Sequence, residues 1–366
     1  MIKILVVDDS ALMRKLFGRV LSGESDMEVR FARNGLEAIA ALGDFLPDVI
    51  TLDINMPEMD GLACLDRIMV ERPTPVVMVS SLSTDGAQTT LEALRLGAVD
   101  FVPKPEGALS LHMDVFGPEL VAKARIAAGA KLKASLRLRD RVLHRIGGAT
   151  SPGKTKAAQP RDATGRRAVG DGVVVVGAST GGPPALEALL TPLPETFAWP
   201  IVVAQHMPAS FTGPLARRLD RLCALQVVEV DRSMPLEPGR AYVGRGDGDV
   251  VISRRGREAV VTPATADAYP WRPSVDRLVR SAMAQFSPGQ IVGVLMTGMG
   301  NDGADAMANL RASGGSTIAE AEDTAVVWGM PGELVKAGGA TTVLPLHKIA
   351  ETLQQLVPHA AHPKDA

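Results

Sequence analysis

Short apolar runs alternate with amphipathic segments along the first part of the chain, and this alternation predicts strands separated by helices. Near-continuous apolar strands are typical of a parallel sheet that helices cover on both faces. The expected strands are residues 2–7, 27–32, 49–53, 76–80 and 100–102, and the expected helices are residues 11–21, 35–42, 62–70, 89–96 and a last one from near Pro118. We therefore predict an open α/β domain over residues 1–121.

The same alternation begins again at the valine run of residues 173–176 and predicts a second α/β domain over residues 173–366. Its other expected strands are residues 199–205, 226–230, 291–296, 316–319 and 341–344, and its expected helices are residues 185–190, 215–222, 275–286, 304–312, 332–337 and 349–356. These strands predict a largely parallel sheet. Three shorter extended pieces, residues 240–243, 249–253 and 258–262, are joined by glycine-rich turns and predict a small antiparallel insertion.

Residues 122–172 separate the two domains. Apolar positions among basic residues predict a helix from Lys123 to Arg145, and the segment after Gly148 is rich in turn formers, which predicts a flexible linker. Lysine and arginine outnumber the acidic residues here, so binding to nucleic acid is one alternative. Because the segment has neither a recognition helix nor interleaved aromatic residues, we favour a solvated linker and expect no nucleic-acid partner.

Composition excludes several other classes of protein. A chain of 366 residues with 46% hydrophobic and 22% charged residues is typical of a globular protein of two domains, and a net charge of −2 gives no basic field. No apolar run reaches the roughly 18–20 residues that a membrane helix needs. Asp8 and Asp9 come too early for a signal peptide, and Cys64 and Cys223 lack metal-binding spacing. We expect a cytoplasmic protein with no membrane insertion.

Five polar residues fall at the carboxyl ends of strands in the first domain: Asp8, Asp9, Asp53, Ser80 and Lys104. Such ends meet in one crevice, where three carboxylates repel one another unless a hard divalent cation such as Mg²⁺ lies between them. Asp53 is then a candidate nucleophile towards a phosphoryl donor. Lys104 would neutralise the phosphate oxygens and Ser80 would offer them a hydroxyl. Helix N-capping is the alternative for each aspartate.

Three further residues follow strands of the second domain: Ser179, His206 and Asp302. The sequence GASTG around Ser179 matches the G-x-S-x-G pattern of a hydrolase nucleophile on a sharp strand-to-helix turn. A base and an orienting carboxylate from neighbouring loops would complete a triad, and the N–H of Met299 in the loop TGMGNDG would serve an oxyanion hole. The alternatives are a core histidine, a helix N-cap and a phosphate-binding turn.

The first domain resembles a response-regulator receiver domain in its motifs LVVDDS, DINMPEMDGL, MVSS and FVPKP. The resemblance implies a flavodoxin-like (βα)5 fold in which Asp53 accepts a phosphoryl group from a histidine kinase. Ser80, Phe101 and Lys104 would form the switch. The Mg²⁺ ligands would be Asp8, Asp9, Asp53 and the backbone carbonyl of Asn55.

The second domain resembles the catalytic domain of the chemotaxis protein-glutamate methylesterase (CheB) family in GASTGGPPAL, VAQHMP, WRPSVDRL and LMTGMGNDG. The resemblance implies a Rossmann-like α/β domain that hydrolyses γ-glutamyl methyl esters on chemoreceptors without a cofactor and also deamidates receptor glutamines. Ser179 would be the nucleophile, His206 the base and Asp302 the orienting carboxylate. Thr180 and Met299 would assist on the oxyanion side. Ser274 and Asp276 would either shape the site or open a helix as an N-cap pair.

Together the two resemblances imply a monomeric esterase that an unphosphorylated receiver domain inhibits by packing over the loops of Ser179 and His206. Its partners would be methyl-accepting chemoreceptors as substrate and a chemotaxis histidine kinase as phosphodonor. Three alternatives remain open at this point: an enzyme that chiefly deamidates glutamine, a non-catalytic module that binds receptors when phosphorylated, and a transcriptional regulator.

Overall fold

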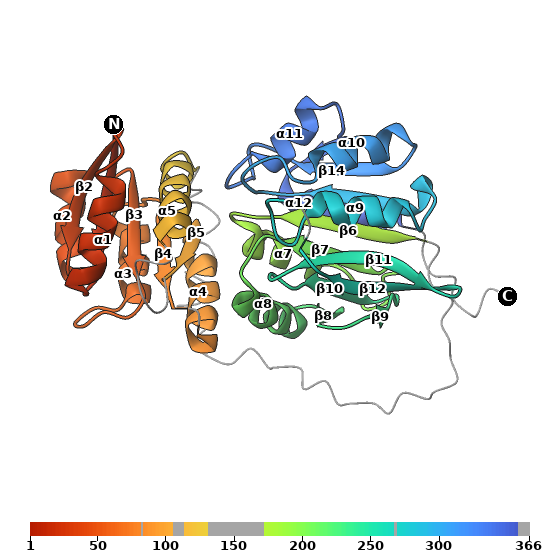
Figure 1. The fold of residues 1–366 in the computed structure, drawn as a ribbon, viewed down its shortest axis with the longest axis horizontal. Coiled ribbons are helices and arrows are strands. Elements are labelled where there is room, and N and C mark those ends of the chain that lie inside the picture. Colours follow the sequence, from red (N-terminus) through yellow and green to blue (C-terminus); the bar gives the residue numbers. More distant parts are fainter. Residues whose placement is uncertain (82, 105–112, 131–171, 267–268, 358–366) are drawn as a thin grey trace.

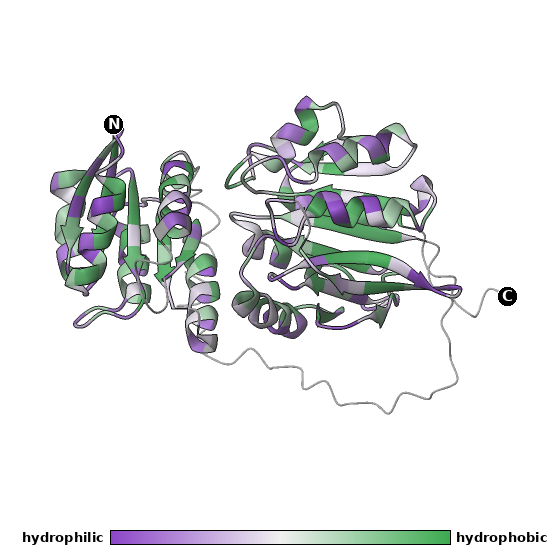
Figure 2. Cartoon of the chain, in the orientation of Figure 1, coloured by the Kyte–Doolittle hydropathy of each residue, from purple (hydrophilic) through white to green (hydrophobic). Residues whose placement is uncertain are grey.

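Two α/β domains lie side by side in the computed structural model, which describes residues 1–81, 83–104, 113–130, 172–266 and 269–357 (Figure 1). The strands of both domains are coloured as mainly hydrophobic, while the helices carry both hydrophobic and hydrophilic residues (Figure 2). This is the pattern expected of sheets that are buried between layers of helices. None of the helices within these ranges is both long and apolar enough to cross a bilayer.

The N-terminal domain contains one sheet of five parallel strands. These are β1 (Ile2–Val7), β2 (Met27–Ala32), β3 (Val49–Asp53), β4 (Val76–Ser80) and β5 (Asp100–Pro103). Their order is β2-β1-β3-β4-β5, so β1 and β3 lie next to each other at the point where the strand order reverses. Open sheets of this kind bind ligands at such a switch point. Asp8 and Asp53 stand at the ends of these two strands, as predicted.

Five helices cover this sheet: α1 (Ala11–Leu21), α2 (Gly35–Phe45), α3 (Gly61–Glu71), α4 (Thr84–Leu96) and α5 (Met113–Ala128). Helix α4 begins five residues earlier than predicted because the hydroxyl of Ser83 caps it, accepting from the N–H of Gly86. The predicted helix from Lys123 to Arg145 is wrong in its extent, since α5 ends before the turn at Gly129. The predicted basic linker lies outside the described residues.

The C-terminal domain contains a sheet of seven strands, all of them parallel to their neighbours. They are β6 (Val173–Ala178), β7 (Ile201–Gln205), β8 (Gln226–Val230), β10 (Arg240–Gly244), β13 (Ile291–Leu295), β14 (Ser316–Glu320) and β15 (Thr342–Leu344). The order is β15-β14-β13-β6-β7-β10-β8. The chain therefore starts in the middle at β6, builds outwards to β8, and returns to build the other half from β13. The switch point lies beside β6.

The predicted antiparallel insertion is partly wrong. The antiparallel sheet consists of β9 (Met234–Pro235), β11 (Asp249–Arg255) and β12 (Glu258–Ala264), in the order β11-β12-β9. Strand β10, which we assigned to it, instead pairs in parallel with β7 and β8 in the large sheet. The physical reason is burial, because Ala241, Tyr242 and Val243 are fully buried and need cover on both faces.

Six α-helices surround the large sheet: α7 (Gly182–Leu190), α8 (Ala209–Leu222), α9 (Val275–Met283), α10 (Ala304–Ala312), α11 (Met330–Lys336) and α12 (Leu346–Leu356); a short 3₁₀ helix, η2, spans Pro288–Gln290. Helix α7 begins before its predicted start because prolines at its first positions need no N–H partner. Helix α8 likewise starts earlier than predicted and contains Pro214.

Helices α4 and α5 and strand β5 of the N-terminal domain face α7, α8 and the neighbouring loops of the C-terminal domain (Figure 1). The rings of Phe101 and Phe211 pack with their centroids 4.3 Å apart, and both belong to one hydrophobic cluster that spans the two domains. Arg218 of α8 binds Glu187 of its own domain and Glu92 of α4, the latter at 3.3 Å. The interface therefore has an apolar centre with an ionic edge.

Candidate active site

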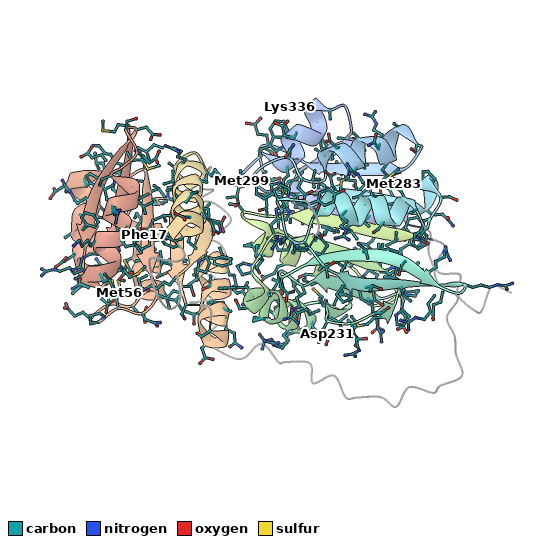
Figure 3. All side chains as sticks on the ribbon, viewed as in Figure 1. Phe17, Met56, Asp231, Met283, Met299 and Lys336 are labelled. Carbon is teal, nitrogen blue, oxygen red and sulfur yellow. The ribbon has the colours of Figure 1, made fainter. Side chains whose placement is uncertain are left out.

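The switch point of the large sheet brings together the three residues predicted as a triad. Ser179 directly follows β6, His206 follows β7, and Asp302 lies in the loop after β13. Because β6 pairs with both β7 and β13, the three loops emerge next to one another at the carboxyl edge. Met299 belongs to the third loop, on the face of the domain that is turned towards the N-terminal domain (Figure 3).

The loop of Ser179 is held by backbone contacts and by one buried amide side chain. The N–H of Ser179 donates to the carbonyl of Thr297 at 3.0 Å. The Nε2 of Gln205, which is 1% exposed, donates to the carbonyls of Ser179 and His206 at 2.9 and 3.1 Å. A Cβ at Gly182 would come within 1.9 Å of the Gln205 Oε1, so this position requires glycine. Gln205, which sequence reasoning did not single out, therefore joins the nucleophile and base loops.

His206 and Asp302 form a buried pair. The Nε2 of His206 lies 2.8 Å from the Oδ2 of Asp302, which is 3% exposed. Asp302 also accepts hydrogen bonds from the Ser274 hydroxyl at 3.1 Å and from the N–H groups of Val275 and Asp276 at 2.6 and 3.0 Å. Burial alone would raise the pKa of Asp302, but hydrogen bonds and charge from His206, with the backbone donors, outweigh it and hold the pKa below its usual value. An ionised Asp302 favours the tautomer with its proton on Nε2.

The alternative interpretation as a helix N-cap holds for Ser274 but not for Asp302. Asp302 does not cap its own helix, since Gly303 holds the N-cap of α10 without a side-chain bond. It instead accepts from the N-terminus of α9. Ser274 does cap α9, accepting from the N–H of Arg277 at 3.3 Å, and it also donates to Asp302, so both interpretations of Ser274 hold. Asp276 accepts from the N–H of Ala306 at 2.9 Å, and burial raises its pKa.

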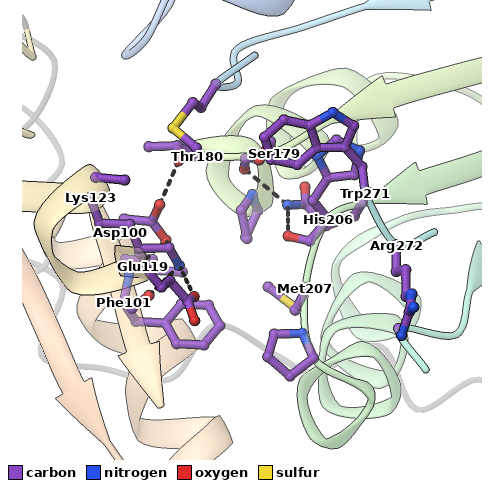
Figure 4. Close-up of a pocket in the computed structure, with 18 of the residues that line it drawn as sticks. Asp100, Phe101, Glu119, Lys123, Ser179, Thr180, His206, Met207, Trp271 and Arg272 are labelled. Atoms are coloured by element: carbon purple, nitrogen blue, oxygen red, sulfur yellow. Dashed lines mark hydrogen bonds and ion pairs between the residues drawn. The ribbon is translucent and has the colours of Figure 1, made fainter. Parts of the chain in front are cut away.

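A cavity of about 360 Å³ lies over these loops, and its walls come from both domains (Figure 4). The N-terminal domain contributes Leu94, Asp100, Phe101, Glu119, Ala122 and Lys123. Ser179, Thr180, His206 and Met299 all line the opposite side. The described residues include no hydrogen bond between the Ser179 hydroxyl and His206, and the Nδ1 of His206 is buried without a partner. This nitrogen is the acceptor that a serine nucleophile needs.

Asp100 is a residue of this cavity that sequence reasoning missed. The hydroxyl of Thr180 donates to its Oδ2 at 2.5 Å, while its Oδ1 accepts from the N–H of Phe101 and pairs with Lys123 (Figure 4). Asp100 and Thr180 are 80 residues apart and belong to different domains. No local pattern could indicate such a contact, because it depends on how two separately folded domains meet.

The second predicted site lies at the switch point of the N-terminal sheet. Single carboxylate oxygens of Asp8, Asp9 and Asp53 lie within 4.8 Å of one another, which suits a hard divalent cation. The Nζ of Lys104 lies 2.8 Å from Asp53 and 3.2 Å from Asp8. Burial raises the pKa of Asp53 despite the opposing effect of Lys104. Burial would lower the pKa of Lys104, but the two carboxylates outweigh it and raise that pKa.

The remaining predicted residues of this site take different positions. The N–H of Asn55 donates to Asp53 at 3.4 Å. The hydroxyl of Ser80 donates to the carbonyls of Ser81 and Gly86, each at 3.2 Å, and so is turned away from Asp53. Phe101 is buried against Phe211 of the other domain and lies under the Lys123 ammonium group. Its ring therefore belongs to the domain interface.

Comparisons with known proteins identify the family of each domain. Residues 174–353 match the family model described as CheB methylesterase, and residues 4–115 match the response regulator receiver domain. A protein of Rhodopseudomonas palustris, named protein-glutamate methylesterase/protein-glutamine glutaminase 2, is 55% identical over 355 residues, which cover 96% of each chain. A protein of Rhodospirillum rubrum with the same activities in its name is 52% identical over 96% of this chain and 95% of its own.

The chain belongs to the CheB methylesterase family. Its N-terminal domain is a receiver domain and its C-terminal domain is the catalytic domain, so both predicted resemblances and the predicted fold class are confirmed. The crystal structure of the catalytic domain of Thermotoga maritima CheB methylesterase covers 52% of this chain and 100% of its own, with 37% identity and a TM-score of 0.50. The chain is therefore an enzyme of this family, joined to its own receiver domain.

The charge of Asp302 can be tested through protein stability. Because its folded-state pKa lies below the ordinary 3.8, its stabilising effect is complete above that value and is lost as the pH falls through the folded pKa. We expect Asp302→Asn to lower the free energy of unfolding near pH 7 by about 2–3 kcal/mol, the worth of hydrogen bonds to a charged acceptor. Thermal unfolding between pH 3 and 7 measures this difference.

The difference in the free energy of unfolding between wild type and Asp302→Asn should shrink as the pH falls below 3.8. Asp305→Asn, which removes an exposed carboxylate from the neighbouring helix α10, is the matched control and should leave stability nearly unchanged at every pH. A constant difference between wild type and Asp302→Asn across this range would contradict the assigned charge.

Proposed function

We propose that this enzyme hydrolyses γ-glutamyl methyl esters on methyl-accepting chemoreceptors and releases methanol. The observation that carries the proposal is the His206–Asp302 pair beside Ser179, at the carboxyl edge of the large sheet. This sheet lies within the residues that match the CheB methylesterase family model. An imidazole with one nitrogen bound to a carboxylate and the other without a partner among the described residues, next to a serine on a sharp turn, is suited to activate that serine for attack on an unactivated ester carbonyl.

In the proposed reaction the Ser179 oxygen attacks the ester carbonyl while Nδ1 of His206 takes the hydroxyl proton. Asp302 holds the opposite nitrogen and stabilises the imidazolium that forms. His206 then returns the proton to the departing methoxide, which leaves as methanol. Water then attacks the acyl-enzyme while His206 takes a proton from it. His206 returns this proton to the Ser179 oxygen, and the glutamate carboxylate is released.

The negative oxygen of the tetrahedral intermediate needs donors that do not rearrange during the reaction. Thr180, the residue after Ser179, and Met299, in the loop after β13, both line the cavity and are our candidates for this role. The Thr180 hydroxyl donates to Asp100 in the structure, so it is engaged by the receiver domain before any substrate binds.

The same acyl-enzyme chemistry would deamidate glutamine, with ammonia as the leaving group in place of methanol. The names of the two relatives include a glutaminase activity, which favours this second reaction. Methanol and ammonia release from suitable receptors would distinguish the two leaving groups.

We further propose that the receiver domain binds Mg²⁺ through Asp8, Asp9 and Asp53, together with the backbone carbonyl of Asn55. The close approach of three carboxylates supports this assignment, and the cation would neutralise charge on a phosphoryl group that arrives from a histidine kinase. Asp53 would accept the phosphoryl group, and Lys104, already at 2.8 Å, would neutralise its oxygens.

We propose that the unphosphorylated receiver domain inhibits the esterase by closing its active site. The cavity over Ser179 measures about 360 Å³ and has receiver residues as one wall. An α-helix with its side chains is about 10–12 Å across, so a receptor helix cannot enter unless this wall moves away. Closure rests on the contacts of Asp100 with Thr180 and of Phe101 with Phe211.

Strand β5 offers a direct route from the phosphorylation site to the active site. Lys104 follows its carboxyl end and binds Asp53, while Asp100, four residues earlier, binds Thr180. A strand rises about 3.3 Å per residue, so the two side chains stand roughly 13 Å apart on one rigid element. When Lys104 and Ser80 are drawn to a phosphoryl group, β5 and Phe101 would shift and weaken the contact with Thr180.

The nucleophile is tested by Ser179→Ala. We expect methanol release from methylated receptors to fall by at least about a thousandfold, because the variant lacks the hydroxyl that attacks the ester. Phosphorylation of Asp53 by a small phosphodonor should be unaffected, which shows that the receiver domain of the variant is folded. Unchanged methanol release would remove Ser179 from the mechanism, and an unchanged chemotactic response to receptor stimuli would favour a non-catalytic binding module.

The inhibitory contact is tested by Asp100→Ala. Without phosphodonor, we expect methanol release to rise about tenfold or more, because a charge-assisted hydrogen bond is worth about 1.5–3 kcal/mol. Asp114→Ala removes an exposed carboxylate from α5 of the same domain and should leave the rate unchanged. Equal rates for wild type and Asp100→Ala, with Asp53 still phosphorylated normally, would contradict inhibition through this contact.

A further inference from the structure

The indole of Trp271 lies parallel to the imidazole of His206. The ring centroids are 5.4 Å apart and the ring planes differ by only 7° (Figure 4). Offset parallel pairs of aromatic rings are favourable at such separations. Trp271 also lines the cavity and is only partly buried, so it is a wall of the active site and not a member of either sheet core.

His206 needs such a contact because its side chain has a single hydrogen bond. Nε2 is bound to Asp302, and Nδ1 has no partner among the described residues. With only this hydrogen bond, the ring can still rotate about its Cβ–Cγ bond, which would move Nδ1 away from the serine hydroxyl. A flat ring lying parallel to the imidazole restricts this rotation. General-base catalysis depends on that alignment.

The position of Trp271 is itself well determined. Three residues further on, the N–H of Ser274 donates to the buried Asp249 at 2.8 Å, and Arg277 binds the other oxygen of Asp249 at 2.6 Å. Residues 271–276 therefore form one anchored segment. Its first residue contacts His206 while its last three donate to Asp302, so a single segment orients two members of the proposed triad.

The opposite edge of the indole meets the loop that carries Met299. Gly300 has a φ of +83°, and a Cβ at this position would lie 2.7 Å from Cζ2 of Trp271. The absence of a side chain at Gly300 lets the indole pack directly against the backbone of this loop. Trp271 thus lies between the base and the loop proposed for the oxyanion side.

We propose that Trp271 is a positioning residue that fixes the orientation of the His206 ring and so keeps Nδ1 directed at Ser179. The role rests on the proposed function of His206 as the base. Trp271 acts through His206 and takes no part in bond making or breaking. A substitution at Trp271 should therefore slow the activation of Ser179, and should do so only when His206 is present.

The test is a double-mutant cycle on the full chain, read by labelling with diisopropyl fluorophosphate. In this reaction the Ser179 oxygen forms a bond to phosphorus, fluoride leaves, and the serine proton passes to His206. The labelling rate reports nucleophile activation without receptor docking, and the receiver domain is the same in every variant. We expect Trp271→Ala to slow labelling about threefold to tenfold, the scale of one aromatic pair, while Trp271→Phe keeps most of the rate.

The decisive comparison is made in the His206→Ala background, where Trp271→Ala should not lower the labelling rate any further. Tyr269→Ala is the matched control, since this aromatic residue two positions before Trp271 contacts Arg280 instead of His206, and its labelling rate should equal that of wild type. The proposal would be overturned if Trp271→Ala were labelled at the wild-type rate, or if it lowered the labelling rate by the same factor with and without His206. A wild-type rate for His206→Ala alone would instead overturn the function proposed for the base.

Discussion

One buried hydrogen bond, from the Thr180 hydroxyl to the Asp100 carboxylate, joins the two halves of this enzyme at the active site. It connects a residue beside the proposed nucleophile to the strand whose other end binds the proposed phosphoacceptor, Asp53, through Lys104. Phe101, the residue after Asp100, packs against Phe211 across the same interface. The proposed catalytic and regulatory sites are therefore linked through a single strand, β5.

Both domains use the same property of parallel sheets for different chemistry. In the receiver domain the switch point gathers carboxylates and a lysine, an arrangement suited to a metal ion and a phosphoryl group. In the catalytic domain the switch point gathers a serine, a histidine and a carboxylate. Positive groups lie beside the carboxylates of each set: Lys104 binds Asp8 and Asp53, and the N-terminus of α9 donates to Asp302.

Much of this arrangement could be predicted from the sequence, because apolar runs give the strands and strand ends give the residues that converge. The pairing of His206 with Asp302 was predicted as part of the triad. The hydrogen bond from Ser274 to Asp302 was not, because the sequence pattern indicated only that Ser274 shapes the site or caps a helix. The pairing of β10 was predicted wrongly because short extended pieces look alike whichever sheet they join. Asp100 and Trp271 were missed, since their contacts depend on domain docking and on loop folding.

The central claim is that phosphorylation of Asp53 opens the active site over Ser179. The most direct test is methanol release from methylated chemoreceptors by the full chain, with and without a small phosphodonor and Mg²⁺. The account predicts a rise of about tenfold or more with the phosphodonor, on the scale of losing one charge-assisted hydrogen bond, and no rise for Asp53→Asn. Equal rates with and without the phosphodonor, in a protein whose Asp53 is shown to be phosphorylated, would contradict it.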